Sequence, residues 1–450
     1  MDLKALTVRN FLQLLTVFGL LCSCGSESKD NSAGSGGLSA SAPNVLLVVV
    51  DTLRADHLGF YGYSTAPTSP FLDSLQAESI IVEGLQAVTS WTMPSMATLF
   101  TGLIPADHKV MRMVGPGSNL METNTLASQF RRSNYATACI MSNFLLGGGG
   151  RGFNEGFDWY DFSLCSPTNP HRGSTAKQVA AHGLEWLAKQ PADKPWFLNL
   201  HFFDPHTSYE DQPDWNFADP SYHGWVVGGL EDEDYKSNQA SSSVTDLCQL
   251  SAFYDEEIRE VDEALRTLIA ALKKSGQWQN TLLVFTTDHG EELAERGYIG
   301  HTRTLHFEQV DLPLMVRLPK AQQIAARRKG LLSQHRLFNT ILELAGLPVV
   351  TGAGPSAADW LLGKHADSEQ EANFFEVDFV PILADPTRRI QKRGMQLGQD
   401  FKFVYDRKIV EEFLFDLQKD PLERNNVVAD PTYAAQVAEM RKRMAAHRWY

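Results

Sequence analysis

Cysteine is scarce in this chain, with only five among 450 residues. They are Cys22, Cys24, Cys139, Cys165 and Cys248. The first two fall in an N-terminal segment and the other three lie far apart, so their spacing excludes a cysteine-rich metal site and a disulfide framework. One disulfide remains open among the last three, and the sequence does not indicate which pair would form it.

Basic charge and internal repetition are scarce as well. The chain has 40 Lys and Arg against 54 Asp and Glu, for a net charge of -14. Such a chain repels polyanions, so we expect no nucleic-acid partner and no charge-driven binding to anionic membranes. It has no repeat of about 20 to 50 residues. Its 43% hydrophobic and 21% charged residues are globular values, which exclude disorder, collagen-like and coiled-coil architectures for most of its length.

The one N-terminal apolar stretch is too short to cross a bilayer. It runs from Phe11 to Leu21 behind the basic Lys4 and Arg9, and its 11 residues compare with the roughly 20 that a spanning helix needs. We interpret residues 1–24 as an export signal. The alternative is a buried N-terminal helix.

The end of this segment, Leu21-Cys22-Ser23-Cys24, resembles the lipobox of bacterial lipoproteins, in which the last cysteine is lipidated. Cys24 is the better candidate because the small Ser23 precedes it. Ten of the 18 residues from Gly25 to Ala42 are Gly or Ser, which indicates a flexible tether at residues 25–43. We therefore expect an exported protein of the bacterial cell envelope, periplasmic or on the cell surface, that is held on the membrane through its lipid anchor only.

From Asn44 onward, short apolar runs alternate with helical periodicity. This alternation predicts an α/β fold with a mainly parallel sheet covered by helices on both faces. The clearest helix is expected at Leu250–Ser275, where apolar residues recur at alternating spacings of four and three. The expected strands are residues 45–50, 138–141, 196–203, 281–286 and 312–318.

Side chains that can carry chemistry follow two of the expected strands. Asp51 comes directly after the apolar run 44–50, and Asp288 and His289 come directly after residues 282–287. Open α/β sheets place their ligand sites at these carboxyl ends, and a carboxylate buried there needs a cation. Two carboxylates and an imidazole that converge from two strands therefore indicate a divalent-metal site. Asp51 could instead cap a helix, and Asp288 could lie in a turn.

Seven segments in chain order resemble motifs of the sulfatase family in the alkaline phosphatase superfamily, and they extend over nearly the whole exported chain. They are Asn44–Gly62, Trp91–Gly102, Asp204–Tyr209, Tyr254–Ile258, Thr287–Glu291, Gly300–His301 and Leu414–Asn425. The resemblance implies a sulfatase-like fold. Residues 44–351 would form a catalytic domain with a mixed, mainly parallel sheet between helices, and residues 352–450 a small C-terminal α+β subdomain of antiparallel strands and a helix.

The chain departs from the family pattern at the usual nucleophile. Sulfatases oxidise a Cys or Ser in Cys-x-Pro-Ser-Arg to formylglycine, whereas this chain reads Thr92-Met93-Pro94-Ser95-Met96. Threonine cannot form that aldehyde, so we expect no formylglycine. After the first strand the family usually has two aspartates, whereas this chain has Asp51-Thr52. The segment that matches the sulfate-holding Lys and His of the family reads Met141-Ser142-Asn143-Phe144 here. Asp311 stands where the family usually has an arginine.

A branch of the superfamily that uses a threonine nucleophile fits these departures better. It includes lipoteichoic acid synthases, phosphoethanolamine transferases and nucleotide phosphodiesterases. By resemblance, one divalent ion (manganese, magnesium, calcium or zinc) would be bound by Asp51, Thr92, Asp288 and His289. Pro94 predicts that Thr92 lies at the start of a helix, whose partial positive charge favours an anionic ester. The alternative for Thr92 is a helix cap.

Two histidines and an asparagine complete the expected site. By resemblance, His206 donates a hydrogen bond to a non-bridging ester oxygen, and His301 faces the leaving group as a general acid. Either could instead be a structural histidine. Asn143 is a candidate for a substrate contact. Asp204, His206 and His301 have the elements of a second metal site, but their spacing is not the usual one and we expect a single ion.

Three functions remain open at this stage. The first is a metal-dependent hydrolase or transferase that acts on an anionic phosphoester, either a phosphodiester or a phosphonate ester, through Thr92. The second is a sulfuric ester hydrolase, a sulfatase in the broad sense. The third is a catalytically silent binding lipoprotein, which Thr52, Met96 and Asp311 favour. Because the expected metal ligands and both histidines are present, we expect an enzyme.

Overall fold

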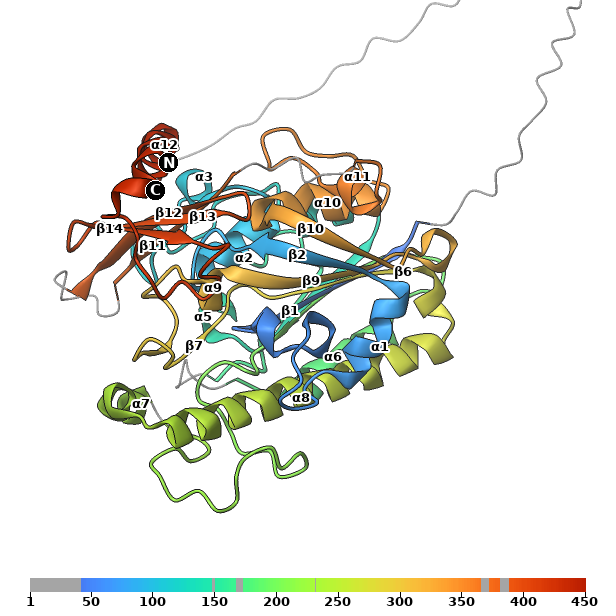
Figure 1. The fold of residues 1–450 in the computed structure, drawn as a ribbon. Helices are drawn as coiled ribbons and strands as arrows, with labels where there is room; N and C mark the ends of the chain where they lie inside the picture. The colour runs from blue at the N-terminus through green and yellow to red at the C-terminus, as the bar shows by residue number, and fades with distance from the viewer. Residues whose placement is uncertain (1–41, 148–149, 167–172, 231, 366–371, 381–387) are drawn as a thin grey trace, which may run out of the picture. The chain divides into compact units, whose positions relative to one another are not determined.

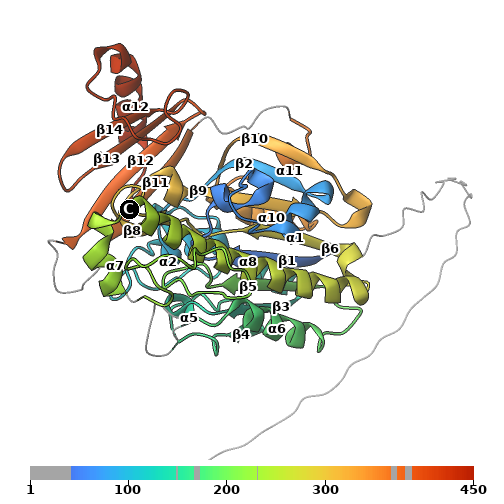
Figure 2. The ribbon, with the colours of Figure 1, turned by 60° about the horizontal axis from the view of Figure 1, so that its bottom comes forward.

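An eight-stranded sheet runs through the computed structural model, which describes residues 42–147, 150–166, 173–230, 232–365, 372–380 and 388–450. The strand order is β10-β2-β9-β6-β1-β5-β3-β4 (Figures 1 and 2). The strands are β1 (Asn44–Val50), β2 (Ile80–Gln86), β3 (Ala136–Met141), β4 (Trp159–Asp161), β5 (Trp196–Phe202), β6 (Thr281–Thr286), β9 (Asp311–Arg317) and β10 (Ala326–Ser333). Strand β9 runs antiparallel to β2 and β6, and the other pairs are parallel. The sheet is therefore mixed and mainly parallel, as predicted.

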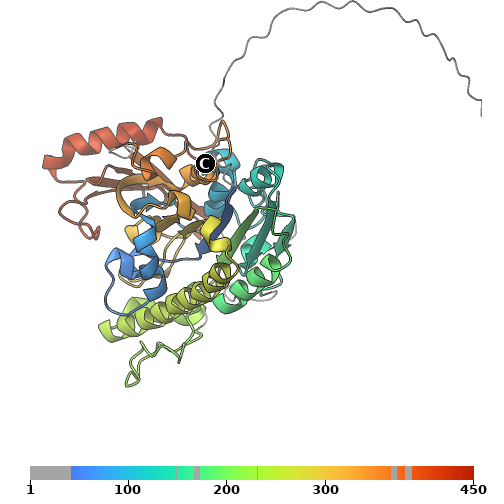
Figure 3. The same ribbon diagram turned by 90° about the vertical axis from the view of Figure 1, so that its right-hand side faces the viewer.

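Helices cover both faces of this sheet (Figures 1 and 3). One core contains side chains of α2 (Thr92–Thr101), α4 (Leu126–Arg132), α10 (Leu337–Leu344) and α11 (Ala358–Leu361). The other contains side chains of α1 (Pro70–Leu75), α6 (Ala176–Leu187) and α8 (Val244–Lys274). Strand β1 contributes Val45, Leu47 and Val49 to the first core and Leu46, Val48 and Val50 to the second. Because it is buried on both faces, its sequence is a continuous apolar run.

Shorter elements connect these layers. They are α3 (Pro105–His108), α5 (Phe144–Gly147), α7 (Asp232–Asn238), α9 (Phe307–Val310) and the two-stranded pair β7 (Glu292–Leu293) and β8 (Ile299–Gly300).

A four-stranded antiparallel sheet lies in the C-terminal part of the chain (Figure 2). Its strands are β11 (Ala372–Phe379), β12 (Ile390–Leu397), β13 (Phe401–Asp406) and β14 (Glu411–Asp416), and it shares a core with α12 (Ala434–Ala446). Phe375 and Val377 of β11 also belong to the core around α2. The small antiparallel sheet with its helix is confirmed, whereas the boundary between residues 351 and 352 stays a prediction.

The five predicted strands are confirmed, with ends that differ by two residues at most. The predicted helix is confirmed too, but α8 begins at Val244, six residues before Leu250. Ser243 explains the difference, because its hydroxyl accepts from the Asp246 amide and the Asp246 side chain accepts from the Ser243 amide. This capping box precedes the apolar periodicity from which the helix was predicted.

Strands β2, β4 and β10 of the eight-stranded sheet were not predicted. The first half of strand β10 carries charged residues that are not fully buried, and Glu83 of β2 forms ion pairs with two of them, Arg327 and Lys329. Strand β2 is also interrupted at Gly84, where φ is +110° and the register with both neighbours shifts. A bulge and a polar edge remove the continuous apolar pattern that marks a buried strand.

Candidate active site

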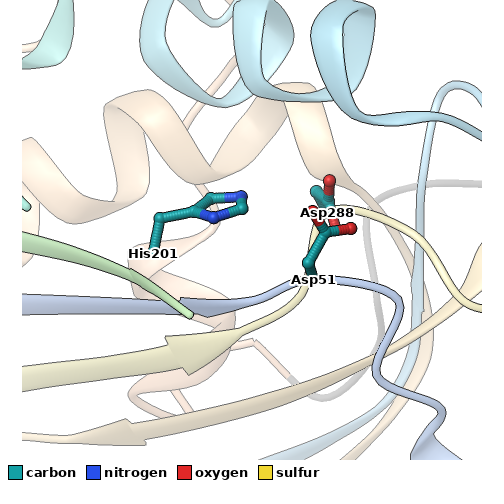
Figure 4. Close-up of side chains that lie close together, drawn as sticks. All are labelled: Asp51, His201 and Asp288. Carbon is teal, nitrogen blue, oxygen red and sulfur yellow. The ribbon is translucent and has the colours of Figure 1, made fainter. Parts of the chain in front are cut away.

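The register of three neighbouring strands places polar side chains together at one end of the sheet. Val49 of β1 pairs with Thr286 of β6 and with His201 of β5. Paired residues of parallel strands share a face, and so does the residue two positions further along. Asp51 and Asp288, two residues beyond Val49 and Thr286, therefore point to the same side of the sheet as His201 (Figure 4).

These three side chains have the spacing of metal ligands. One ligand atom from each of Asp51, His201 and Asp288 lies within 4.8 Å of the others, and all three side chains are 0% exposed. Among the described residues, neither Asp51 Oδ1, nor Asp288 Oδ2, nor either ring nitrogen of His201 has a hydrogen-bond partner. Buried polar atoms without hydrogen bonds lower the stability of the folded protein unless a ligand binds them. The donor set therefore fits a divalent metal ion.

The charges around Asp51 and Asp288 also indicate a site for a metal ion. Burial, together with the nearby charge of Asp288, raises the pKa of Asp51 well above its ordinary value. Burial lowers the pKa of His201 to about 4 and also lowers the pKa of His289, so both rings are neutral at pH 7. Within the described ranges, no lysine or arginine forms an ion pair with either carboxylate. A bound cation would supply the missing charge.

Thr92 lies at the edge of this cluster. It is the first residue of α2, and its Oγ1 is 3.2 Å from Nε2 of His289. The same nitrogen lies 3.7 Å from Asp51 Oδ1 and 3.4 Å from Asp288 Oδ2. His289 Nδ1 donates to the Gly290 carbonyl oxygen at 3.0 Å, so the lone pair of Nε2 faces Thr92. The structure thus brings the four predicted metal ligands together.

The first turn of α2 is fastened to the loop that carries Asp288. Ser95 Oγ donates to the Asp288 carbonyl oxygen at 2.6 Å. The N-cap position belongs to Trp91, which makes no side-chain capping bond, and Pro94 lies in the first turn as predicted. Thr92 therefore does not occupy the N-cap position, which argues against helix capping. Met96, where sulfatases carry an arginine, is completely buried in the apolar core.

Asn143 lies beside Asp51. Its Nδ2 donates to Asp51 Oδ2 at 2.5 Å, and its Oδ1 accepts from the Leu145 amide at 2.8 Å. Asp51 therefore has one oxygen held by Asn143, while the other has no hydrogen-bond partner in the described part of the chain. The amide that was expected to contact substrate contacts a predicted metal ligand.

His206 and His301 lie near each other and near His289. Their ring centroids are 5.0 Å apart, and the rings of His301 and His289 are 4.4 Å apart. Glu291, which is 0% exposed, accepts from His301 Nδ1 at 2.8 Å and from Thr207 Oγ1 at 3.4 Å. Asp204 is separately engaged, since its Oδ2 accepts from the Ala176 amide at the start of α6.

Two residues of the cluster were not predicted. His201 was counted only as part of an expected strand, although the polar residues Asn199 and His201 alternate with apolar ones there, and this alternation marks one face of the strand. Glu291 was noted in the motif after Thr286 without a role, and its contact with His301 depends on the fold. The spacing of residues along the chain predicts neither the position of His201 beside the two carboxylates nor the contact of Glu291 with His301.

The remaining predictions have mixed outcomes. Cys139, Cys165 and Cys248 are all free thiols. Asp311 begins β9 and accepts from Gln86 at 2.8 Å.

Cys24, the export segment and all but the end of the tether lie outside the described residues. In the part of the chain that the structure describes, no helix combines the length and apolarity that a membrane span requires.

Known proteins match this chain over most of its length. The family model described as Sulfatase covers residues 43–347, and the one described as N-sulphoglucosamine sulphohydrolase, C-terminal, covers residues 294–449. The chain is 25% identical to the multifunctional alkaline phosphatase superfamily protein PehA of Trinickia caryophylli, over 90% of this chain and 95% of that protein. It is 23% identical to an arylsulfatase of Clostridium perfringens, over 89% of this chain and 93% of that protein.

Two solved phosphonate monoester hydrolases share the fold. The enzyme of Agrobacterium radiobacter has a TM-score of 0.71 at 23% identity, and the match covers 90% of this chain and 95% of that one. The enzyme of Silicibacter pomeroyi has a TM-score of 0.72 at 22% identity, with the same coverage of both chains. Because the sulfatase model matches residues 43–347 of 450, about two thirds of the sequence, this chain belongs to the sulfatase family and is an enzyme of that family.

Proposed function

We propose that this chain is a metal-dependent phosphoester hydrolase or phosphotransferase with Thr92 as its nucleophile. The observation that carries the proposal is the 3.2 Å contact between Thr92 Oγ1 and His289 Nε2, beside two buried carboxylates that lack a cationic partner in the described structure. A hydroxyl is a weak nucleophile at neutral pH and needs such surroundings to react.

Asp51, Thr92, Asp288 and His289 would hold one divalent ion. Bound there, the ion would lower the proton affinity of the Thr92 hydroxyl and offset the negative charge that develops on the ester oxygens. The N-terminal end of α2, a helix of ten residues, would add its partial positive charge. Asn143 would keep Asp51 in place through its 2.5 Å hydrogen bond.

The reaction would proceed in two balanced steps. Thr92 Oγ, whose proton has passed to water, attacks phosphorus, and the bond from phosphorus to the leaving oxygen breaks as that oxygen takes a proton from His301. His206 would donate a hydrogen bond to a non-bridging oxygen. Water or an acceptor alcohol then attacks the phosphothreonine and gives a proton to His301. The bond between phosphorus and Oγ breaks and Oγ takes a proton from water, which restores the Thr92 hydroxyl.

The identity of residue 92 favours phosphorus over sulfur. A sulfate ester on threonine lacks the aldehyde route by which formylglycine releases sulfate, whereas a phosphothreonine can be attacked again at phosphorus. The two phosphonate monoester hydrolases support a phosphodiester or phosphonate ester as substrate. Sulfuric ester hydrolysis is the second candidate, since an arylsulfatase is among the relatives.

We also propose the location and layout inferred from the sequence. Residues 1–24 would direct export, Cys24 would carry a lipid in the bacterial envelope, and residues 25–43 would tether the catalytic domain 44–351 and the subdomain 352–450. The support is the sequence of the first 43 residues.

A panel of nitrophenyl esters tests the function. Phosphate monoester, phosphodiester, phosphonate monoester and sulfate would be compared at equal metal loading, with and without an acceptor alcohol. We expect repeated turnover of a phosphodiester or phosphonate ester, and at most one turnover of sulfate. Repeated turnover of sulfate as the fastest reaction would favour the second candidate. Products that incorporate the alcohol would indicate transfer, and free phosphate or phosphonate would indicate hydrolysis.

A further inference from the structure

His201 is a buried histidine whose ring has no hydrogen bonds within the described structure. It is 0% exposed, and both Nδ1 and Nε2 lack partners. A neutral imidazole has one donor and one acceptor, and leaving both unsatisfied in the protein interior costs free energy. Another buried histidine, His108 of α3, shows the usual arrangement, since Thr98 and the Val110 amide contact its two nitrogens. An orphaned ring of this kind requires an explanation.

The position of His201 supplies one. Strand β5 lies directly beside β1, and the Asp51 amide donates to the carbonyl oxygen of Phe202, the residue after His201. The ring consequently faces the two carboxylates, with ligand atoms of all three residues inside 4.8 Å (Figure 4). One ligand atom of each residue thus lies close enough to the other two for all three to bind one ion.

We propose that His201 is a direct ligand of the divalent ion, and that it makes the site selective for zinc over calcium and magnesium. This inference rests on the proposed metal site and goes beyond it, because the ligand set expected there contains a single imidazole. With His201, two imidazoles, two carboxylates and the Thr92 hydroxyl would share the ion.

The selectivity follows from ligand chemistry. Calcium takes six to eight oxygen ligands and magnesium keeps an octahedral oxygen shell with several waters, as general rules. Imidazole nitrogen suits zinc and its neighbours among the transition metals instead. Thr52, directly after Asp51, has a neutral side chain and offers no further carboxylate to a calcium ion. Each change from carboxylate to imidazole therefore moves preference away from calcium.

Metal binding to the purified full-length protein tests the inference without an activity assay. Stripped wild type, His201→Ser, His182→Ser and Asp288→Asn would be titrated with zinc alone and with calcium alone, using calorimetry and elemental analysis. His182 is a matched control, since its ring contacts Asp161 on β4, outside the cluster. We expect His201→Ser to weaken zinc binding roughly 10- to 100-fold, to leave calcium binding within about 3-fold, and to remove the preference for zinc. His182→Ser should bind as wild type does.

The outcomes separate this inference from the proposed function. If His201→Ser binds zinc as tightly as wild type while Asp288→Asn does not, the site is real and the role of His201 is wrong. If Asp288→Asn also binds normally, the proposed metal site itself fails. Should His201→Ser not fold, a crystal structure of the zinc-loaded wild type decides. A zinc–nitrogen distance of about 2.0 to 2.1 Å at His201 supports the inference, and a ring that does not touch the ion overturns it.

Discussion

Glu291 Oε1 accepts a hydrogen bond from His301 Nδ1 at 2.8 Å, and the Glu291 side chain is completely buried. This contact keeps a proton on Nδ1 and leaves Nε2 to exchange a proton with the leaving group, and the carboxylate stabilises the imidazolium that acts as the acid. Glu291 is then a positioning residue for the proposed general acid.

We expect Glu291→Gln to lower kcat roughly 10- to 100-fold for an alkyl ester, because a poor leaving group needs the proton. For a nitrophenyl ester, which leaves without protonation, the loss should be much smaller. The comparison of the two esters, with metal content measured alongside, checks this. Equal losses for both would mean that Glu291 has only a structural role.

Asp288 should be essential for metal binding. Its Oδ1 is held by the His289 amide at 2.9 Å, so Oδ2 is the oxygen available to an ion. Asp288→Asn removes the charge and should weaken binding by about 100-fold or more. Elemental analysis would compare it with wild type and with Asp161→Asn, a carboxylate of β4 that pairs with His182. Equal metal in all three would exclude Asp288 from the site.

Stability should depend on pH through Glu376 of β11. Burial raises the pKa of its carboxyl from 4.5 to about 7, although the Tyr450 amide donates to it at 3.0 Å. Between those two values the unfolded chain releases a proton that the folded chain keeps, so stability falls as pH rises and levels off above 7. The fall from pH 5 to 8 should be about 2 to 3 kcal/mol.

Urea unfolding of wild type and Glu376→Gln at several pH values measures this effect. The variant cannot ionise, so its stability should lose less over that range, and the difference between the two proteins should change with pH. Two parallel curves would show that Glu376 does not cause the dependence.

Lipidation should occur at Cys24. In cells fed labelled palmitate, Cys24→Ala should lose the label and the membrane attachment, because the cysteine sulfur is the acceptor. Cys22→Ala is the control and should keep both. Label lost only in Cys22→Ala would move the site by two residues, and label retained in both variants would exclude a lipobox here.

The sequence predicts the part of the fold and the site that follows from local pattern. Buried parallel strands are mostly apolar runs, so Asp51 and Asp288 stand out as the first charged residues after β1 and β6. The apolar run of β2 is broken at Glu83 and Gly84, where the register shifts, and the first half of β10 carries charged residues, two of which pair with Glu83. For these strands, the partner must be known before the pattern can be interpreted.

Residues whose contacts depend on the tertiary structure were harder to predict from the sequence. His201 lies inside a strand, and only the pairing of β5 with β1 brings it beside Asp51. Likewise, the sequence gives no sign that Glu291 contacts His301 or that Asn143 contacts Asp51, since these contacts join residues 10 and 92 positions apart. The candidate metal ligands were predicted from strand ends and from the resemblance, whereas the residues that contact them could be found only from the register of the strands.

The most direct test of this account is intact-protein mass spectrometry after rapid acid quench of metal-loaded protein with a phosphodiester or phosphonate ester. Wild type should gain one phosphoryl or phosphonyl group on Thr92, and Thr92→Ser should retain part of the rate because it keeps the hydroxyl. Thr92→Ala should show no adduct and no turnover while it stays folded, since Thr92 makes no capping bond. Full activity in Thr92→Ala, or turnover by wild type with no adduct at any quench time, would contradict the assignment of Thr92 as nucleophile.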